Sequence, residues 1–317
     1  MTNSAAMTLD SITFHYDQRC ALDAVSWEVR EGELFALLGP NGSGKTTLFR
    51  LLATLIPLQR GKVEIFGHSL LTAVRRARYD MGIVFQSPSV DGKLTVFENL
   101  RLQASLYGYS GKAARERIAE VASQLGIADR QRDRVDDLSG GLRRRLELAK
   151  SLLHQPRLLI MDEPTTGLDP AARSDLWNYL RQLQQQTGMT VFMTTHLLDE
   201  AENADRVAIL NEGQVVALDD PQVLCRELGA DVISIRSSNP ESLATALQAE
   251  FNLPSKQIGG LLRMEQPDSS DLAQVIMKKF RDQIQTMTLG RPSLEDVFIS
   301  KTGHQFWHNE VRSGERQ

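Results

Sequence analysis

The 317-residue chain has only two cysteines, few aromatic residues and no long apolar run. Cys20 and Cys225 are far apart and show no C-x-x-C spacing, so we expect two reduced thiols and no metal or redox motif. No apolar run approaches the roughly 18 residues that a membrane-spanning helix needs, and the first residues lack the apolar stretch of a secretory signal. A function at a membrane would therefore require another chain to supply the spanning part.

Charge of one sign is not in excess either. The 36 Lys and Arg residues nearly balance 40 acidic residues, so the net charge of −4 gives no reason to expect a nucleic-acid partner. Hydrophobic residues make up 41% of the chain, close to ordinary globular proteins. The length fits two domains, or one domain with additions.

A glycine-rich stretch, GPNGSGKTT at 39–47, follows an apolar run at 33–38 and precedes a segment with helical spacing. It fits G-x-x-x-x-G-K-[ST], and a strand before it with a helix after it is the context that a phosphate loop requires. Glycines let backbone N–H groups approach phosphate oxygens, and the helix N-terminus adds partial positive charge. We predict that Lys45 contacts the β- and γ-phosphates of a nucleotide and that Thr46 offers a hydroxyl to Mg²⁺. The alternative is a flexible loop with a solvated lysine.

A second motif, LLIMDEP, ends a predicted strand at 157–164 with two carboxylates. The carboxyl ends of strands in an open α/β sheet face the crevice where ligands bind. Asp162 is therefore predicted to hold Mg²⁺, directly or through water, and Glu163 to polarise a water toward the γ-phosphate. An ordinary charged strand exit is the alternative, which the neighbouring phosphate loop disfavours.

Hydrophobic spacing predicts the remaining organisation. Strands alternating with helices indicate a largely parallel α/β sheet. A helical pattern between about 88 and 155 interrupts it, with Thr95 and Glu98 as a capping box. A weaker alternation after 225 predicts a small α/β domain that ends in a helix. Further predicted elements are strands at 63–67, 81–86 and 188–196, a hairpin at 206–218 with Glu212 and Gly213 in its turn, and a helix at 142–153.

Six motifs of the chain follow one another in the order found in the ATP-binding subunit of ABC transporters. The chain resembles that family over roughly residues 8–224. Besides the two motifs above, the matching stretches are VFQSP, LSGGL at 138–142, TTGLDP with Asp169, and TTH. The resemblance implies an α/β P-loop NTPase fold, the ABC ATPase core with a helical subdomain, over 1–224. A small accessory α/β domain over 226–303 and a polar, frayed tail over 304–317 would complete the chain.

The resemblance also implies roles for individual residues. Glu163 would activate water, His196 would sense the γ-phosphate, and Gln86 would link Mg²⁺ and water to the helical subdomain. Outside this pattern, Tyr16 would be read as a surface or core aromatic and His196 as a structural histidine. The implied ATP-binding residues are Tyr16 (on the adenine), Gly39, Pro40, Asn41, Gly42, Ser43, Gly44, Lys45, Thr46, Thr47, Ser139, Gly140 and Gly141; the implied Mg²⁺ ligands are Thr46, Gln86 and Asp162.

The stretch at 138–142 implies a partner subunit. Ser139, Gly140 and Gly141 open a predicted helix, whose N-terminus is a second anion site. By the family's geometry this site completes the ATP site of another subunit, so we expect a homodimer, or a heterodimer with another ABC ATPase. Leu142 departs from the family's frequent glutamine, which predicts at most a modest change in hydrolysis. The arginines at 143–145 are expected on a solvated or interface face.

The C-terminal stretch RPSLEDVFISKTG resembles exporter ATPases of the daunorubicin-resistance type, which pair with separate membrane permeases. The favoured hypothesis is therefore the ATPase subunit of an exporter, peripheral on the cytoplasmic side of the membrane. An importer ATPase, or a non-transport ABC ATPase acting on nucleic acid or ribosomes, remain alternatives. The net charge of −4 and the absence of a second cassette argue against the last one.

Overall fold

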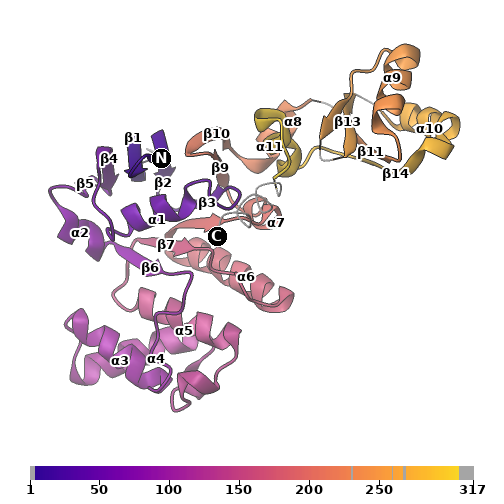
Figure 1. The fold of residues 1–317 in the computed structure, drawn as a ribbon. Coiled ribbons are helices and arrows are strands. Elements are labelled where there is room, and N and C mark those ends of the chain that lie inside the picture. The colour runs from indigo at the N-terminus through magenta and orange to yellow at the C-terminus, as the bar shows by residue number, and fades with distance from the viewer. Residues whose placement is uncertain (1–3, 230, 259, 267–268, 307–317) are drawn as a thin grey trace. The chain divides into compact units, whose positions relative to one another are not determined.

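The computed structural model describes residues 4–229, 231–258, 260–266 and 269–306 (Figure 1). It divides into two compact units, each described separately below. The domain boundary near residue 225 stays a prediction. The first unit comprises Met1–Leu37, Gly44–His196 and Glu212–Gln214; the second comprises Leu38–Ser43, Leu197–Asn211 and Val215–Gln317.

An antiparallel sheet in the first unit is the main feature that the sequence analysis did not predict. Its strand order is β2-β1-β4-β5, and β1 pairs with both β2 and β4. Val25, Trp27 and Val29 are buried and alternate with exposed residues, as in a sheet with one covered face. The strand predicted at 63–67 belongs here rather than to the parallel sheet. The strands are β1 (Ala5–Tyr16), β2 (Arg19–Arg30), β4 (Arg60–Ile65) and β5 (His68–Ser69).

The buried sheet of the first unit carries strands in the order β3-β8-β7-β6. β6, β7 and β8 are parallel, as predicted. Every residue of β3, β7 and β8 is buried, which is typical of parallel strands covered on both faces. Phe35 stacks between Trp27 and Phe192, with ring centroids 6.0 and 5.9 Å away. The strands are β3 (Leu34–Leu38), β6 (Met81–Val84), β7 (Leu158–Asp162) and β8 (Thr190–Thr195).

The helices of the first unit include the predicted helical subdomain. Thr95 and Glu98 form the predicted capping box of α3, with both reciprocal hydrogen bonds present. Leu100, Ile118 and Leu146 are fully buried, one from each of the three helices α3, α4 and α5. The helices are α1 (Lys45–Leu52), α2 (Val74–Tyr79), α3 (Val96–Leu106), α4 (Gly111–Gln124), α5 (Gly140–Leu152) and α6 (Pro170–Thr187), with 3₁₀ turns at Ala128–Arg130 and Val135–Asp137.

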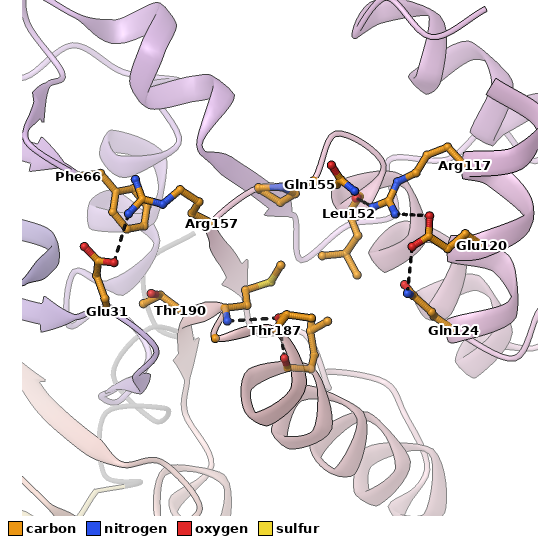
Figure 2. Close-up of a pocket in the computed structure, with 14 residues that line it drawn as sticks. Glu31, Phe66, Arg117, Glu120, Gln124, Leu152, Gln155, Arg157, Thr187 and Thr190 are labelled. Carbon is orange, nitrogen blue, oxygen red and sulfur yellow. Dashed lines mark hydrogen bonds and ion pairs between the residues drawn. The ribbon is translucent and has the colours of Figure 1, made fainter. Parts of the chain in front are cut away.

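A pocket of about 490 Å³ lies where α4 and the end of α5 meet the N-terminal ends of β7 and β8 (Figure 2). On one side the Arg157 guanidinium lies 3.6 Å from the centre of the Phe66 ring and donates to Glu31 at 3.2 Å. On the other side Arg117 donates to the carbonyl oxygens of Leu152 and Leu153, at the end of α5. None of the predicted site residues lines this pocket.

The second unit contains most of the two strands of the predicted hairpin, and the C-terminal sheet. β9 (Arg206–Asn211) and β10 (Gln214–Asp219) flank Glu212 and Gly213, whose φ angles of +49° and +81° are typical of a type I′ turn. The C-terminal sheet is antiparallel, in the order β12-β13-β11-β14. The elements are α7 (Leu198–Ala201), α8 (Pro221–Glu227), β11 (Asp231–Ser237), α9 (Pro240–Phe251), β12 (Lys256–Ile258), β13 (Leu261–Gln266), α10 (Ser270–Lys279), a 3₁₀ turn at Arg281–Gln283, β14 (Ile284–Gly290) and α11 (Leu294–Thr302).

Buried apolar residues of β11 and β13 pack against α9 and α10, so the C-terminal sheet has a core of its own. The buried Arg263 on β13 donates to Asp296 of α11 at 2.6 Å, which links the last helix to the sheet. Phe306 lies within the segment predicted as a polar tail, yet it is fully buried and packs edge-on against Phe298. The rest of that tail, 307–317, lies outside the described residues.

Candidate nucleotide-binding and hydrolysis site

The glycine-rich loop has a shape that side chains would obstruct. A Cβ added at Gly39 would lie 2.5 Å from the Leu210 carbonyl oxygen and 2.5 Å from Ser43 Oγ. Gly42 and Gly44 have φ angles of +81° and +112°, in the left-handed region that favours glycine. Ser43 Oγ is buried without a hydrogen-bond partner among the described residues. This narrow loop, with a buried hydroxyl that lacks a partner, fits the predicted cradle for a nucleotide's phosphates.

Lys45 begins α1 directly after the loop, and its side chain is 4% exposed. Its Nζ lies 3.6 Å from Glu163 Oε1. Burial lowers the pKa of Lys45, while the charges of Glu163 and Asp162 oppose that shift. Thr46, the next residue, is exposed. The predicted phosphate lysine and the predicted base are thus direct neighbours.

Glu163 is the centre of the site. Its Oε2 accepts a hydrogen bond from Gln86 Nε2 at 3.1 Å and lies 3.0 Å from His196 Nδ1. Thr166 Oγ1 donates to the same oxygen at 3.4 Å. Three predicted catalytic residues, Glu163, His196 and Gln86, are therefore brought together from three separate segments.

The backbone of Glu163 has a φ of +42°, an uncommon conformation for a residue with a side chain. Its N–H donates to both the carbonyl oxygen and the Oγ1 of Thr194, each at 3.1 Å. These bonds hold the strained residue at the end of β7. Burial by itself raises the pKa of Glu163, but His196 and Lys45 outweigh it, so that the pKa lies below the usual value and the carboxylate is ionised.

Asp162 is buried and accepts a short hydrogen bond of 2.6 Å from Thr194 Oγ1. Burial raises the pKa of Asp162, and the bond from Thr194 opposes this shift. Among the described residues, no group of three or more His, Cys, Asp and Glu side chains could hold a metal ion. The predicted Mg²⁺ set has one carboxylate with a hydroxyl and an amide, which fits Mg²⁺ because that ion takes much of its coordination from water and substrate phosphates.

Thr194 and Thr166 are site residues that the sequence reasoning missed. Thr194 is the first residue of the TTH stretch, and in the parallel pairing of β7 with β8 it lies opposite Asp162. A threonine on the strand next to the carboxylate strand is placed to bond a carboxylate, and both strands can be predicted from the sequence. Which threonine lies beside Asp162 follows only from the register in which the two strands pair.

The stretch at 138–142 does not belong to the cluster around Glu163. Ser139 is the N-cap of α5, and its Oγ accepts from Leu142 N at 3.3 Å. It borders a hollow of about 840 Å³ that Gly140, Gly141 and the start of α6 also line. A Cβ at Gly140 would meet no atom within 4 Å. Asp169 caps α6 by accepting from Ala172 N at 2.9 Å.

Two further predictions concern Tyr16 and the arginines at 143–145. Tyr16 is 42% exposed at the end of β1, with its ring edge-on to Phe14 at 4.9 Å, and its contact with adenine stays a prediction. Arg145 is partly exposed and pairs with Asp175. The expectation of a solvated or interface face is wrong for Arg144, which is buried and paired with Glu147 at 2.8 Å.

Known proteins resemble this chain in both sequence and fold. A family model described as ABC transporter matches residues 22–166. The daunorubicin/doxorubicin resistance ATP-binding protein DrrA of Streptomyces peucetius is 37% identical over 297 residues, which cover 91% of this chain and 90% of that protein. The Nod factor export ATP-binding protein I of Neorhizobium galegae is 36% identical over 96% of this chain and 88% of its own length.

Solved structures agree with the predicted core. The cbiO1 protein of Clostridium perfringens, part of the ABC transporter complex cbiONQ, has a TM-score of 0.65 and 25% identity, and covers 78% of this chain and 96% of its own. The ATP-binding cassette MJ1267 in its ADP conformation has a TM-score of 0.61 and 25% identity, over 68% of this chain and 91% of its own. The predicted fold is thereby confirmed. Identity to DrrA over 91% of the chain, together with the phosphate loop and the cluster around Glu163, shows that this chain belongs to the ATP-binding, ATP-hydrolysing proteins of ABC transporters.

Proposed function

We propose that this chain hydrolyses ATP at Glu163, as one of two ATPase subunits that drive a separate membrane permease in an export system. One observation carries the hydrolytic part: Lys45, Gln86 and His196 surround both oxygens of the Glu163 carboxylate. The ionised carboxylate is the form that can accept a proton from an attacking water. Lys45 then contacts the phosphates, and His196 steadies the charge that develops on the γ-phosphate.

Mg²⁺, held by Asp162, Thr46 and Gln86, would neutralise charge on the phosphates. The main-chain N–H groups of Gly39–Thr47 would hold the phosphates themselves, and Tyr16 would stack on the adenine. Thr194 acts on Asp162 and on the Glu163 backbone together, so it keeps the two carboxylates in a fixed relation.

The second subunit follows from the place of Ser139, Gly140 and Gly141. They line a hollow that none of Lys45, Gln86, Asp162 or Glu163 lines. An anion site at the start of α5 would thus serve a nucleotide bound by another copy or by a related ATPase. ATP would then join two subunits, and its hydrolysis would release them.

Export and the membrane partner rest on the relatives. The names of relatives at 36–37% identity describe resistance to daunorubicin and doxorubicin, export of Nod factor and resistance to linearmycin. Among the residues that the structure describes, no helix has the length and apolar character to cross a bilayer. By likeness to these relatives, we propose that the chain works at the cytoplasmic face of a membrane, bound to a permease.

The hydrolytic site is tested with Glu163→Gln, which keeps the shape of the side chain and removes the base. ATP binding should persist, while turnover should fall by about 10²–10⁴-fold, the usual contribution of a general base. The bound variant should accumulate as a dimer in light scattering. Glu116→Gln, a change at an exposed residue of α4, is the control and should behave like the wild type. Wild-type turnover of the Glu163 variant would remove Glu163 from this role.

Export is tested through the gene neighbourhood and co-purification. A neighbouring gene for a chain with several hydrophobic spans, whose product co-purifies with this protein, would support export. A neighbouring gene for a solute-binding protein would instead indicate import. Co-purification with ribosomes or DNA and with no membrane chain would contradict the transport function.

A further inference from the structure

Three charged residues on α5 face the segment that carries Gln86. Arg144, Glu147 and Lys150 are spaced three residues apart, so they lie along one side of the helix. The segment is residues 85–89, referred to below as the glutamine loop. Neither the motifs nor the relatives assign a role to these three side chains.

Each of them bonds the backbone of the glutamine loop. Arg144 donates to the carbonyl oxygen of Phe85 at 2.7 Å and approaches that of Gln86 at 3.5 Å. Glu147 Oε1 accepts from Ser89 N at 2.6 Å, and Lys150 Nζ donates to Ser89 O at 2.5 Å. The loop is thus bonded on both sides of its glutamine to a single helix.

Two of the three side chains, those of Arg144 and Glu147, are buried. Arg144 is 6% exposed and Glu147 is 3% exposed, and the two are paired at 2.8 Å. Buried charges remain only where partners satisfy them, and here the partners include the main chain of the loop. A loop held in this way has little freedom to move apart from α5.

The other end of this arrangement is the hydrolytic site. Gln86 Nε2 donates to Glu163 Oε2 at 3.1 Å. A continuous series of bonds therefore runs from α5 through the loop backbone to the Gln86 amide and the Glu163 carboxylate. The same helix begins at Gly140, directly after its N-cap Ser139.

We infer that Arg144, Glu147 and Lys150 are positioning residues, which set the place of Gln86 against Glu163 by fixing the glutamine loop to α5. The inference rests on the proposed roles of Gln86 and Glu163 in hydrolysis. It means that one rigid helix sets both the orientation of Ser139–Gly141 and the geometry of its own subunit's base. A shift of α5 at its N-terminus would then move Gln86 as well.

The simpler alternative is that these residues only stabilise the helical subdomain. Both ideas predict some loss of stability on mutation, so stability alone does not decide between them. They differ in their dependence on Gln86. A positioning role acts through the Gln86 side chain and disappears when that side chain is removed, whereas a purely structural role does not.

A double-mutant cycle makes this distinction. Lys150→Met and Glu147→Gln are each made in the wild type and in Gln86→Ala, and kcat and KM for ATP are measured well below the melting temperature of every variant. In the wild type we expect each change to lower kcat by about tenfold with KM within about twofold. In Gln86→Ala we expect a further change of less than about twofold. Lys112→Met, an 89% exposed lysine on α4, is the matched control and should change neither background.

Equal losses of kcat in both backgrounds would overturn the inference, and so would an effect confined to KM or no effect in the wild type. Lys150→Met, which removes one bond of a partly exposed side chain, decides the matter if Glu147→Gln fails to fold. The proposed function is judged separately. Wild-type turnover of Glu163→Gln would overturn that function, whereas a slow Glu163→Gln with an additive cycle would overturn only the positioning role.

Discussion

Lys45 is almost fully buried, and its Nζ lies 3.6 Å from the carboxylate of Glu163. A phosphate that binds Lys45 must compete with that carboxylate. At an effective dielectric constant near 20, one pair of unit charges about 4 Å apart is worth roughly 4 kcal/mol before desolvation. The phosphates of a nucleotide carry several negative charges where Glu163 carries one, so they should attract Lys45 more strongly.

Lys45→Ala should therefore weaken ATP binding by at least about tenfold, because a loss of 1.4 kcal/mol already has that effect. Isothermal calorimetry measures the affinity directly. Lys62→Ala, at an exposed lysine of β4, serves as the control. Unchanged affinity of the Lys45 variant would take this residue out of the nucleotide site.

His154 is a buried histidine that lies outside the site. Its Nε2 lies 2.9 Å from the Met81 carbonyl oxygen, and its ring stacks on Tyr107 at 3.9 Å. Burial lowers the pKa of His154 and Arg117 adds to the effect, while the Met81 carbonyl opposes it. The native state therefore favours neutral His154.

This preference predicts the direction of a pH effect. The contribution of His154 to stability is complete above the unfolded pKa of about 6.5 and is lost as the pH falls from there toward the lowered native pKa, by up to about 1.4 kcal/mol per pH unit. His154→Gln should reduce the difference between urea unfolding midpoints at pH 7.5 and 5.5. The exposed His15, changed to Gln, is the control. An undiminished difference in the His154 variant would contradict the prediction.

At the scale of elements, two helix starts of the helical subdomain provide a matched pair. The Thr95 side chain caps α3 and belongs to a capping box. Ser110 is the N-cap residue of α4, yet its side chain makes no capping hydrogen bond. Threonine and serine are both favoured at N-caps, so residue type alone does not distinguish the two positions. The capping hydrogen bond, present at Thr95 and missing at Ser110, does distinguish them.

Thr95→Ala should lower stability by about 1 kcal/mol, the usual contribution of a capping side chain. Ser110→Ala should change it by much less. Urea unfolding followed by circular dichroism compares the two. Equal losses would show that the capping bonds at Thr95 do not stabilise α3.

Sequence patterns located most elements because local signals specify them. The capping box of α3, the turn at Glu212–Gly213 and the buried run of β7 each depend on neighbouring residues. The strand β1 was missed because its pairing has register shifts, which interrupt a simple alternation along it. The alternation of Val25, Trp27 and Val29 in β2 was readable in the sequence and went unused. Glu163 was found from its motif, but Thr194 needed the pairing of two distant strands. Arg144 was misplaced for the same reason, since the carbonyl of Phe85 to which it donates lies 59 residues earlier in the chain.

At the scale of the whole molecule, two glycines differ in what their surroundings demand. At Gly39 an added Cβ would collide with the Leu210 carbonyl and Ser43, so the fold of this chain by itself forbids any other residue. Gly140 has no atom within 4 Å of such a Cβ, and its φ lies outside the left-handed region.

Gly140→Ala should consequently leave the isolated chain as stable as before, or slightly more so, because alanine favours helices. A methyl group that harms nothing inside the chain can still obstruct a surface that arrives from outside. If a second subunit presses its nucleotide against this spot, the variant will melt at the wild-type temperature and yet hydrolyse ATP slowly. Turnover of Gly140→Ala at the wild-type rate would mean that no second subunit or nucleotide packs against Gly140, and that the two subunits meet elsewhere.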